Sequence, residues 1–167
     1  MKKSIVLIGM PGCGKSTIGK IIAKDLNYDF CDMDEYIEEI SGKKIPELFQ
    51  EGESIFRDWE TKACKELANK ENFVIASGGG VVKRNVNMEI LKGKCIIVFI
   101  DRPTEDIIKD VNVSTRPLLK DGVSKIYDLY NERYELYKKV ADVTVVNKGL
   151  IEEVIESCEK VVRKFFC

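Results

Sequence analysis

The sequence predicts an α/β fold in which a parallel β-sheet carries helices on both of its faces. Three observations support this prediction. Short apolar runs typical of buried strands recur along the chain, helical patterns separate these runs, and the first run leads through a glycine-rich loop directly into a helix. Sheets of this kind bind ligands at the carboxyl ends of their strands, so the residues that follow each strand are the first candidates for function.

The expected elements alternate regularly along the chain. Apolar runs predict five strands, at residues 5–8, 29–32, 73–76, 95–100 and 143–146. A helix is expected over residues 16–26, because four apolar side chains fall on one of its faces: Ile18, Ile21, Ile22 and Leu26. Further helical patterns begin at Glu35, include residues 56–60 and start again near Ser124. Residues 112–122 interrupt the pattern and suggest a mobile excursion.

Length and composition are typical of one soluble domain. The chain has 167 residues, enough for a substantial core, and 44% of them are hydrophobic while 33% are charged. With 27 basic and 28 acidic side chains the net charge is −1, which gives no support for nucleic-acid binding. The apolar runs are too short to span a bilayer, and the amino terminus shows no secretory signal, so we expect a cytoplasmic protein with no membrane partner. No long exposed apolar stripe asks for a protein partner, and we expect a monomer.

The residue types that the chain lacks narrow its chemistry. There is no histidine, which excludes imidazole metal ligands and Ser–His or Cys–His nucleophile pairs. Acid–base work must then fall to carboxylates, lysines, tyrosines or water. The six cysteines form no CxxC pair and no metal-finger spacing, so we expect reduced thiols. Cys13 lies within the glycine-rich loop, where we interpret it as a small side chain tolerated at a variable position rather than as a redox group.

The glycine-rich loop is the strongest single motif. Residues 9–17 read Gly-Met-Pro-Gly-Cys-Gly-Lys-Ser-Thr and match the GxxxxGK[ST] phosphate-binding pattern. Backbone N–H groups in such a loop form an anion-sized nest at the positive end of the following helix. We therefore expect Lys15 to reach the β- and γ-phosphates of a nucleotide and the Ser16 hydroxyl to hold Mg²⁺. The alternative is a glycine-rich turn that binds nothing, and the strand before the loop and the helix after it argue against that alternative.

Two carboxylates follow the second expected strand. Asp32 and Asp34 are separated by one residue, so one of them could face Mg²⁺ and the phosphates while the other faces a second ligand. Taken alone, the pair is explained more simply as a helix N-cap followed by a first-turn acid. Its position at the end of a strand beside the phosphate loop favours the functional interpretation.

A run of three glycines and three arginines complete the candidate set. The glycines at residues 78–80 are easiest to explain if another group approaches the backbone closely, because a tight turn would need only one or two. Arg57 lies in a helical pattern, which by itself favours a solvated charge over an inward anion clamp. Arg116, in the interrupted segment, could close over a transferring phosphate or be a surface loop residue. Arg133, on the following helix, can offer a planar fork to a carboxylate.

Taken together, these segments closely resemble the shikimate kinases, small members of the nucleoside-monophosphate-kinase-like P-loop group. The resemblance covers nearly the whole chain and rests on six motifs in the family's order: GMPGCGKST at 9–17, DMD at 32–34, FRDWE at 56–60, SGGGVV at 77–82, RPLL at 116–119 and RYELY at 133–137. It implies one three-layer αβα domain over residues 1–167, with a five-stranded parallel sheet in the order 2-3-1-4-5. It also implies a substrate-binding region over about 33–61 and a lid over about 112–122. The implied reaction is phosphorylation of the 3-hydroxyl of shikimate by ATP with Mg²⁺.

The resemblance assigns roles to the matching residues. Asp34 would bind the reacting hydroxyl and act as its base, either by removing the proton fully or by orienting the hydroxyl, and Lys15 and Arg116 would join it in catalysis. Asp32 would organise Mg²⁺ together with Ser16. ATP would be bound by Gly12, Cys13, Gly14, Lys15, Ser16, Thr17 and Arg116. Shikimate would be bound by Asp34, Arg57, Gly78, Gly79, Gly80 and Arg133, with Gly79 as the most direct backbone contact.

The chain departs from the family pattern where adenine is expected to bind. Many members carry an arginine that stacks on adenine, and Lys109 occupies the matching region here, so that a planar stack is excluded. The segment 145–149 lacks the aspartate and proline that many members have in the adenine loop. We therefore hypothesise that adenine is recognised through backbone contacts, or that the chain selects less strictly among nucleotides.

Two alternatives remain open, a related enzyme and a protein of another class. A related kinase could act on gluconate or a nucleoside monophosphate, although two arginines suited to one carboxylate favour shikimate, and a monophosphate acceptor would call for more basic groups. A nucleotide-binding regulatory module could keep the fold without turnover. Such a module would have no need of Asp34 and Arg116, so their presence argues against it.

Overall fold

The five predicted strands form one parallel sheet in the computed structural model, which describes residues 4–110 and 122–165. The strands are β1 (Ser4–Ile8), β2 (Asp29–Asp32), β3 (Phe73–Ala76), β4 (Cys95–Asp101) and β5 (Val143–Val146). They lie in the order β2-β3-β1-β4-β5, and Ile5 of β1 pairs with Val74 of β3 on one side and with Ile96 of β4 on the other. The predicted α/β fold class and the implied strand order are confirmed.

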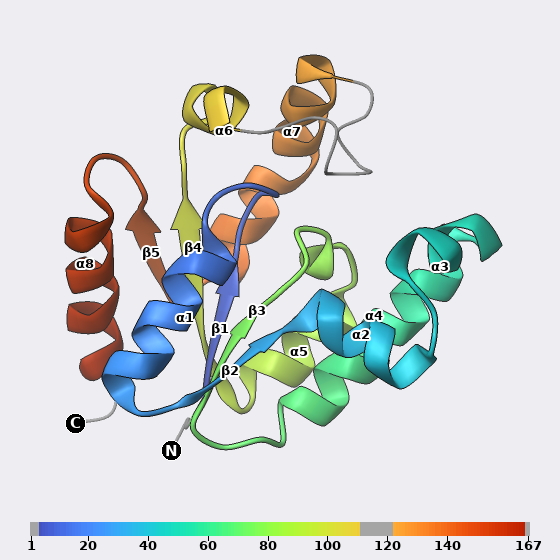
Figure 1. The fold of residues 1–167 in the computed structure, drawn as a ribbon, viewed down its shortest axis with the longest axis horizontal. Coiled ribbons are helices and arrows are strands. Elements are labelled where there is room, and N and C mark those ends of the chain that lie inside the picture. Colours follow the sequence, from blue (N-terminus) through green and yellow to red (C-terminus); the bar gives the residue numbers. More distant parts are fainter. Residues whose placement is uncertain (1–3, 111–121, 166–167) are drawn as a thin grey trace.

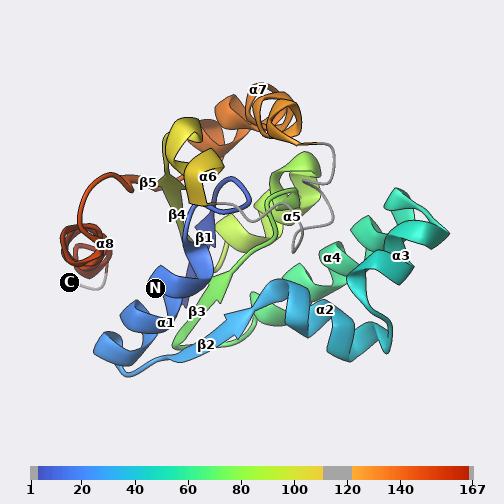
Figure 2. The same ribbon diagram turned by 45° about the horizontal axis from the view of Figure 1, so that its top comes forward.

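The helices form the outer layers of the domain. They are α1 (Lys15–Leu26), α2 (Met33–Ser41), α3 (Ile45–Glu51), α4 (Glu53–Leu67), α5 (Asn85–Lys92), α6 (Thr104–Asp110), α7 (Val123–Val140) and α8 (Ile151–Arg163), with a short 3₁₀ helix η1 at Val81–Lys83. The helices α1 and α8 pack together on one face of the sheet, whereas α5 and α7 pack against β4 from the other (Figures 1 and 2). The group α2, α3 and α4 projects beyond the edge strand β2 (Figure 2).

The two long apolar runs occupy the middle of the sheet. Every residue of β1 is buried, as is every residue of β4 except Asp101, while the edge strands β2 and β5 are only partly buried. Continuous apolar runs are typical of parallel strands that are covered on both faces. The helix α1 approaches the sheet closely at Gly19, because a Cβ there would lie 2.8 Å from the Phe30 ring. This close packing holds the first half of α1, which follows the phosphate loop, against the sheet.

Other expectations from composition concern thiols and membranes. The cysteines of the described residues are free, and all of them except Cys31 are buried. In the stretches 4–110 and 122–165, no helix has the length and apolar character needed to cross a membrane.

Candidate active site

The glycine-rich loop joins β1 to α1 at the carboxyl edge of the sheet (Figure 1). Its first part is a tight turn over residues 10–13, closed by a hydrogen bond of 3.1 Å from the Cys13 N–H to the Met10 carbonyl. Gly12 has φ 83°, which a type II turn requires of its third residue, and Pro11 precedes it. Gly14 is also left-handed, with φ 100°, and leads into α1. The sequence Met-Pro-Gly-Cys-Gly therefore specifies the shape of the loop.

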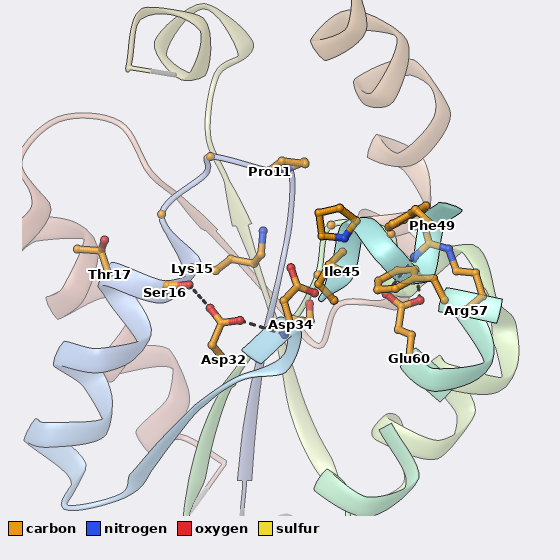
Figure 3. Close-up of a pocket in the computed structure, with 18 residues that line it drawn as sticks. Pro11, Lys15, Ser16, Thr17, Asp32, Asp34, Ile45, Phe49, Arg57 and Glu60 are labelled. Carbon is orange, nitrogen blue, oxygen red and sulfur yellow. Dashed lines mark hydrogen bonds and ion pairs between the residues drawn. The ribbon is translucent and has the colours of Figure 1, made fainter. Parts of the chain in front are cut away.

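Lys15 is ordered by the loop that it belongs to. Its side chain is buried, and Nζ donates hydrogen bonds to the carbonyls of Gly9 at 2.8 Å and Met10 at 2.9 Å. Lys15 also lines the cavity beside the loop (Figure 3). The ammonium group is thereby held at the mouth of the phosphate nest, where an anion would meet it.

Asp32 connects the phosphate loop with the end of β2. Its Oδ2 accepts a hydrogen bond of 2.8 Å from the Ser16 hydroxyl, and its Oδ1 accepts from the backbone N–H groups of Asp34 at 3.0 Å and Glu35 at 3.4 Å. Asp32 is therefore the N-cap of α2 and the partner of Ser16 at the same time. The structural interpretation of Asp32 as a helix N-cap is confirmed, and its role beside Mg²⁺ and the phosphates stays a prediction that the bond to Ser16 favours.

A cavity of about 530 Å³ brings most of the predicted site residues together (Figure 3). The phosphate loop and the start of α1 contribute Pro11, Gly12, Gly14, Lys15, Ser16 and Thr17. The remaining lining residues are Asp32, Asp34, Ile45, Pro46, Phe49, Phe56, Arg57, Glu60, Ser77, Gly78, Gly79 and Gly80. Cys13 is buried and does not line the cavity, so only its backbone remains a candidate for contact with phosphate.

Asp34 projects into this cavity from the first turn of α2 (Figure 3). Its side chain is open to the cavity, yet the protein around it desolvates the carboxyl group, and Asp32 adds a like charge. Both influences raise the pKa of Asp34 above its usual value, while Lys15 and Arg57 oppose them. A carboxylate with a raised pKa is a better proton acceptor, and the two cations are the groups that favour its charged form.

Arg57 is buried, so the interpretation as a solvated charge is wrong. Only 7% of its surface is exposed, because α4 turns this face toward the cavity. Its Nη1 donates to both carboxylate oxygens of Glu60, at 3.0 and 2.9 Å, and its Nε and Nη2 donate to Glu53 at 3.4 and 3.3 Å. A buried guanidinium at the wall of a cavity fits the alternative interpretation, an inward anion clamp.

Glu60 is a site residue that the sequence analysis missed. It is 1% exposed, lines the cavity and pairs with Arg57. Burial raises the pKa of Glu60 above its usual value, and the nearby Arg57 opposes this shift. The available signal was the spacing of three residues between Arg57 and Glu60, which places both side chains on one helix face.

An apolar wall was also missed. Ile45 and Pro46 from α3, together with Phe49 and Phe56, line the same cavity (Figure 3). The rings of Phe49 and Phe56 stack with their centroids 4.4 Å apart. In the sequence these residues look like ordinary core positions, since periodicity does not show which apolar face borders a cavity.

Each of the three glycines allows a close approach, as expected for a run of this kind. A Cβ on Gly78 would lie 3.0 Å from Asp34 Oδ1, and one on Gly79 would lie 2.9 Å from the Pro11 ring. A Cβ on Gly80 would lie only 2.4 Å from Nη2 of Arg57. The glycine run therefore lets the backbone pass between the phosphate loop and the arginine.

Arg133 lies on α7 and is 3% exposed, but it is absent from the cavity lining. Its Nε donates to Glu132 at 3.5 Å, and its buried Nη1 has no hydrogen-bond partner among the described residues. A buried unpaired guanidinium nitrogen has a large desolvation cost, and an anionic ligand would relieve it. One turn further along α7, the Tyr137 hydroxyl donates to the Gly79 carbonyl and ties this helix to the glycine run.

Two further predictions concern the lid with Arg116 and the residues expected near adenine. Arg116 and nearly all of the predicted lid at 112–122 fall outside the described residues. Lys109 borders a second, more open cavity of about 230 Å³ between α6 and the segment after β5, and its side chain is 73% exposed. The other lining residues of this second cavity are Arg102, Asp106, Asp110, Asn147, Lys148 and Gly149. Lys109 and the atypical segment 145–149 therefore meet in space.

The fold and the site together define a P-loop kinase that acts on a small molecule. The family model for shikimate kinase matches residues 11–163 of the chain. The chain belongs to the shikimate kinase family.

Individual relatives agree with this assignment. A shikimate kinase of Clostridium botulinum (strain Alaska E43 / Type E3) is 56% identical over 162 residues, which cover 97% of this chain and 98% of the relative. A solved structure of shikimate kinase from Acinetobacter baumannii in complex with shikimate has a TM-score of 0.90 and 33% identity, covering 98% of this chain and 94% of that one. A gluconokinase from Sinorhizobium meliloti reaches a TM-score of 0.58 at 19% identity, covering 92% and 87%, and shares the fold alone.

Proposed function

We propose that this enzyme transfers the γ-phosphoryl group of ATP to the 3-hydroxyl of shikimate. The observation that carries the proposal is the composition of one cavity, which joins the phosphate loop to Asp34 and to the buried Arg57 (Figure 3). A phosphoryl donor and a small carboxylate acceptor need these two kinds of group within one enclosed space. Membership of the shikimate kinase family supports the choice of acceptor.

On the donor side, the loop holds the phosphates through its backbone and through Lys15. The N–H groups of residues 15–17 are the first of α1 and have no partner within the helix, and the helix dipole there favours negative charge. Lys15 is already held beside them by two carbonyls. Arg116 is assigned to the transferring phosphoryl group on the basis of the resemblance, since it lies outside the described residues.

Ser16 and Asp32 are suited to hold Mg²⁺. Their oxygens lie 2.8 Å apart, and hydroxyl and carboxylate oxygens are ligands that Mg²⁺ prefers. Within residues 4–110 and 122–165, no group of three His, Cys, Asp or Glu side chains is placed to hold a metal. Such a sparse protein contribution fits Mg²⁺, which keeps several waters and binds substrate phosphates. When bound, Mg²⁺ neutralises charge on the phosphates.

On the acceptor side, Asp34 receives the reacting hydroxyl. The hydroxyl oxygen forms a bond to the γ-phosphorus, the bond from that phosphorus to the bridging oxygen of ADP breaks, and the hydroxyl proton passes to the Asp34 carboxylate. Arg57 and Arg133 bind the carboxylate of shikimate with paired N–H groups. The backbone at residues 78–80 and the rings of Phe49 and Phe56 enclose the ring of the acceptor and exclude water.

We also propose that the chain works as a monomer in the cytoplasm, as one domain whose acceptor region is about 33–61. The monomer rests on the sequence, in which no long exposed apolar stripe indicates a protein partner. Sedimentation of the purified protein at several concentrations checks the monomer, and a mass that rises with concentration contradicts it.

A panel of acceptors tests the proposed reaction. ADP release is measured with ATP and Mg²⁺ in the presence of shikimate, gluconate or nucleoside monophosphates. We expect turnover that depends on shikimate and greatly exceeds that with every other acceptor. Faster turnover with gluconate or a monophosphate would reassign the acceptor. If the rate of ADP release does not depend on any acceptor, or if no ADP is released, a regulatory nucleotide-binding module would be favoured instead.

A further inference from the structure

Two side chains outside the sequence motifs hold the phosphate loop from the nucleotide side. Asn147 follows β5 directly, and its Nδ2 donates a hydrogen bond of 2.8 Å to the carbonyl of Cys13. Arg102 follows β4 directly, and its Nη1 donates a hydrogen bond of 3.1 Å to the carbonyl of Gly12. Two successive carbonyls of the loop thus bind donors that lie 134 and 90 residues away in the sequence.

These bonds fix the direction of the loop N–H groups. In a trans peptide the N–H points opposite to the C=O, and the described chain contains no cis peptide. Because the Cys13 carbonyl points to Asn147, the Gly14 N–H must point to the opposite side of the loop. Gly14 lines the main cavity, where phosphate is expected. By the same rule, the bond from Arg102 sets the Cys13 N–H, which closes the turn onto Met10.

The loop needs such external support because of its glycines. Gly12 and Gly14 take left-handed conformations, and glycine without its partners samples many other conformations as well. The two donor residues are themselves held in place by other contacts. The Asn147 N–H donates to the Asp101 carbonyl at 2.7 Å, which continues the pairing of β5 with β4, and Arg102 also forms an ion pair with Asp110.

We propose that Asn147 and Arg102 are positioning residues that hold the phosphate loop in its anion-binding shape. The proposal rests on the proposed kinase function only in taking phosphate as the ligand. Both side chains also border the second cavity, so a competing role is direct contact with the nucleotide base. A ligand that has phosphates and no base separates the two roles.

The test uses the affinity of the full chain for inorganic tripolyphosphate and for ADP, each with Mg²⁺ and without shikimate. For Asn147→Ala we expect Kd to rise about fivefold for both ligands, the effect of losing one hydrogen bond. We expect the KM for shikimate and the Tm to stay at the values of Val146→Ala, the control at the exposed neighbouring position. Asn147→Leu keeps about the same side-chain size, removes the donor and adds no charge that would repel phosphate, and it carries the test if the alanine variant does not fold.

Arg102 needs a control for charge. Arg102→Gln and Lys109→Gln each remove one positive charge from the same cavity, but only Arg102 bonds the loop. We expect the loss of tripolyphosphate affinity to be severalfold greater for Arg102→Gln. Equal losses in the two variants would overturn its positioning role.

Other outcomes overturn the role of Asn147. If its variants weaken ADP alone and bind tripolyphosphate normally, Asn147 contacts the base. If the variants raise the KM for shikimate, weaken tripolyphosphate binding and lower the Tm together, Asn147 contributes to general stability instead. Wild-type turnover with the acceptor panel is measured separately, so a failure of the proposed function is recognised independently of these results.

Discussion

At the scale of single residues, Asp34 is the group on which both halves of the cavity act. Desolvation and Asp32 raise its pKa, while Lys15 from the donor side and Arg57 from the acceptor side favour its charge. Its carboxylate is therefore influenced at once by the phosphate loop and by the buried arginine of α4.

Replacing this carboxylate tests the proposed base. We expect Asp34→Asn to lower kcat by a factor on the order of 10² to 10⁴, the usual contribution of a general base, with little change in ATP affinity. Wild-type kcat/KM for shikimate should fall as the pH drops through the Asp34 pKa, which lies above the usual carboxyl value, and the variant should lack this limb. Steady-state kinetics from pH 5 to 9 are compared with Glu35→Gln, an exposed neighbour. Turnover of Asp34→Asn at the wild-type rate would remove Asp34 from the base role.

Arg57 requires a careful substitution because Glu60 depends on it. Alanine would leave a buried carboxylate unpaired, a change that destabilises proteins by about 3 to 5 kcal/mol. We therefore expect Arg57→Lys to be folded and to weaken shikimate binding by on the order of 1.5 to 3 kcal/mol, because the planar fork is lost. The KM for ATP should not change. Arg84→Lys, at a half-exposed ion pair with Asp58, is the matched control, and an effect confined to ATP would exclude the clamp.

At the scale of elements, the glycine run after β3 lies between the phosphate loop and Arg57. It passes Pro11 on one side and Arg57 on the other, and Tyr137 on α7 holds its middle carbonyl. A side chain larger than hydrogen at Gly80 would require Arg57 to move, although the backbone conformation, with φ −97°, is open to any residue.

A methyl group added at Gly80 should displace the guanidinium group of Arg57. In Gly80→Ala, the added Cβ would lie 2.4 Å from Arg57 Nη2, so we expect Arg57 to shift and shikimate binding to weaken by on the order of 1.5 to 3 kcal/mol, the contribution of a hydrogen bond to a charged group. Gly93→Ala serves as control, because a Cβ there meets its nearest atom at 3.6 Å, an ordinary contact. Isothermal titration with shikimate measures both variants. Equal affinities would mean that Arg57 can move aside without loss and is not needed where it stands.

The sequence predicted those parts of the site that depend on local pattern. The phosphate loop, the Asp32 cap and the glycine run follow from turn chemistry and strand ends, so they could be placed without coordinates. The burial of Arg57 could not, because a helical arginine is usually solvated and its surroundings come from α2 and η1 as well as its own helix. Asn147 and Arg102 were missed because each acts through a contact between elements that are distant in the sequence. Phe49 was missed because periodicity does not show which apolar face borders a cavity.

At the scale of the whole molecule, the site reduces the stability of the fold. The raised pKa values of Asp34 and Glu60 mean that the folded protein binds their protons more tightly than the unfolded chain. Stability therefore falls as the pH rises from the ordinary carboxyl pKa through the folded values, and the full loss is present above them.

This linkage predicts a stabilised variant with poor activity. At pH 7.5, we expect the Tm of Asp34→Asn to exceed that of the wild type, because the amide removes the unfavourable charge from the cavity. The difference should shrink as the pH is lowered toward the ordinary carboxyl range. Thermal unfolding at several pH values, with Glu35→Gln alongside, measures it. A Tm below that of Glu35→Gln at pH 7.5 would contradict the prediction.

The position of β1 at the centre of the sheet has one more consequence. The strands on one side of it, β2 and β3, enclose residues 33–72, which supply Asp34, Arg57 and the apolar wall, while β4 and β5 carry Arg102 and Asn147 on the other side. Most residues proposed to bind the acceptor thus belong to one continuous segment, a cassette that connects the neighbouring strands β2 and β3. Exchanging that cassette for another of similar length is a route to a new acceptor that leaves the ATP side of the enzyme unaltered.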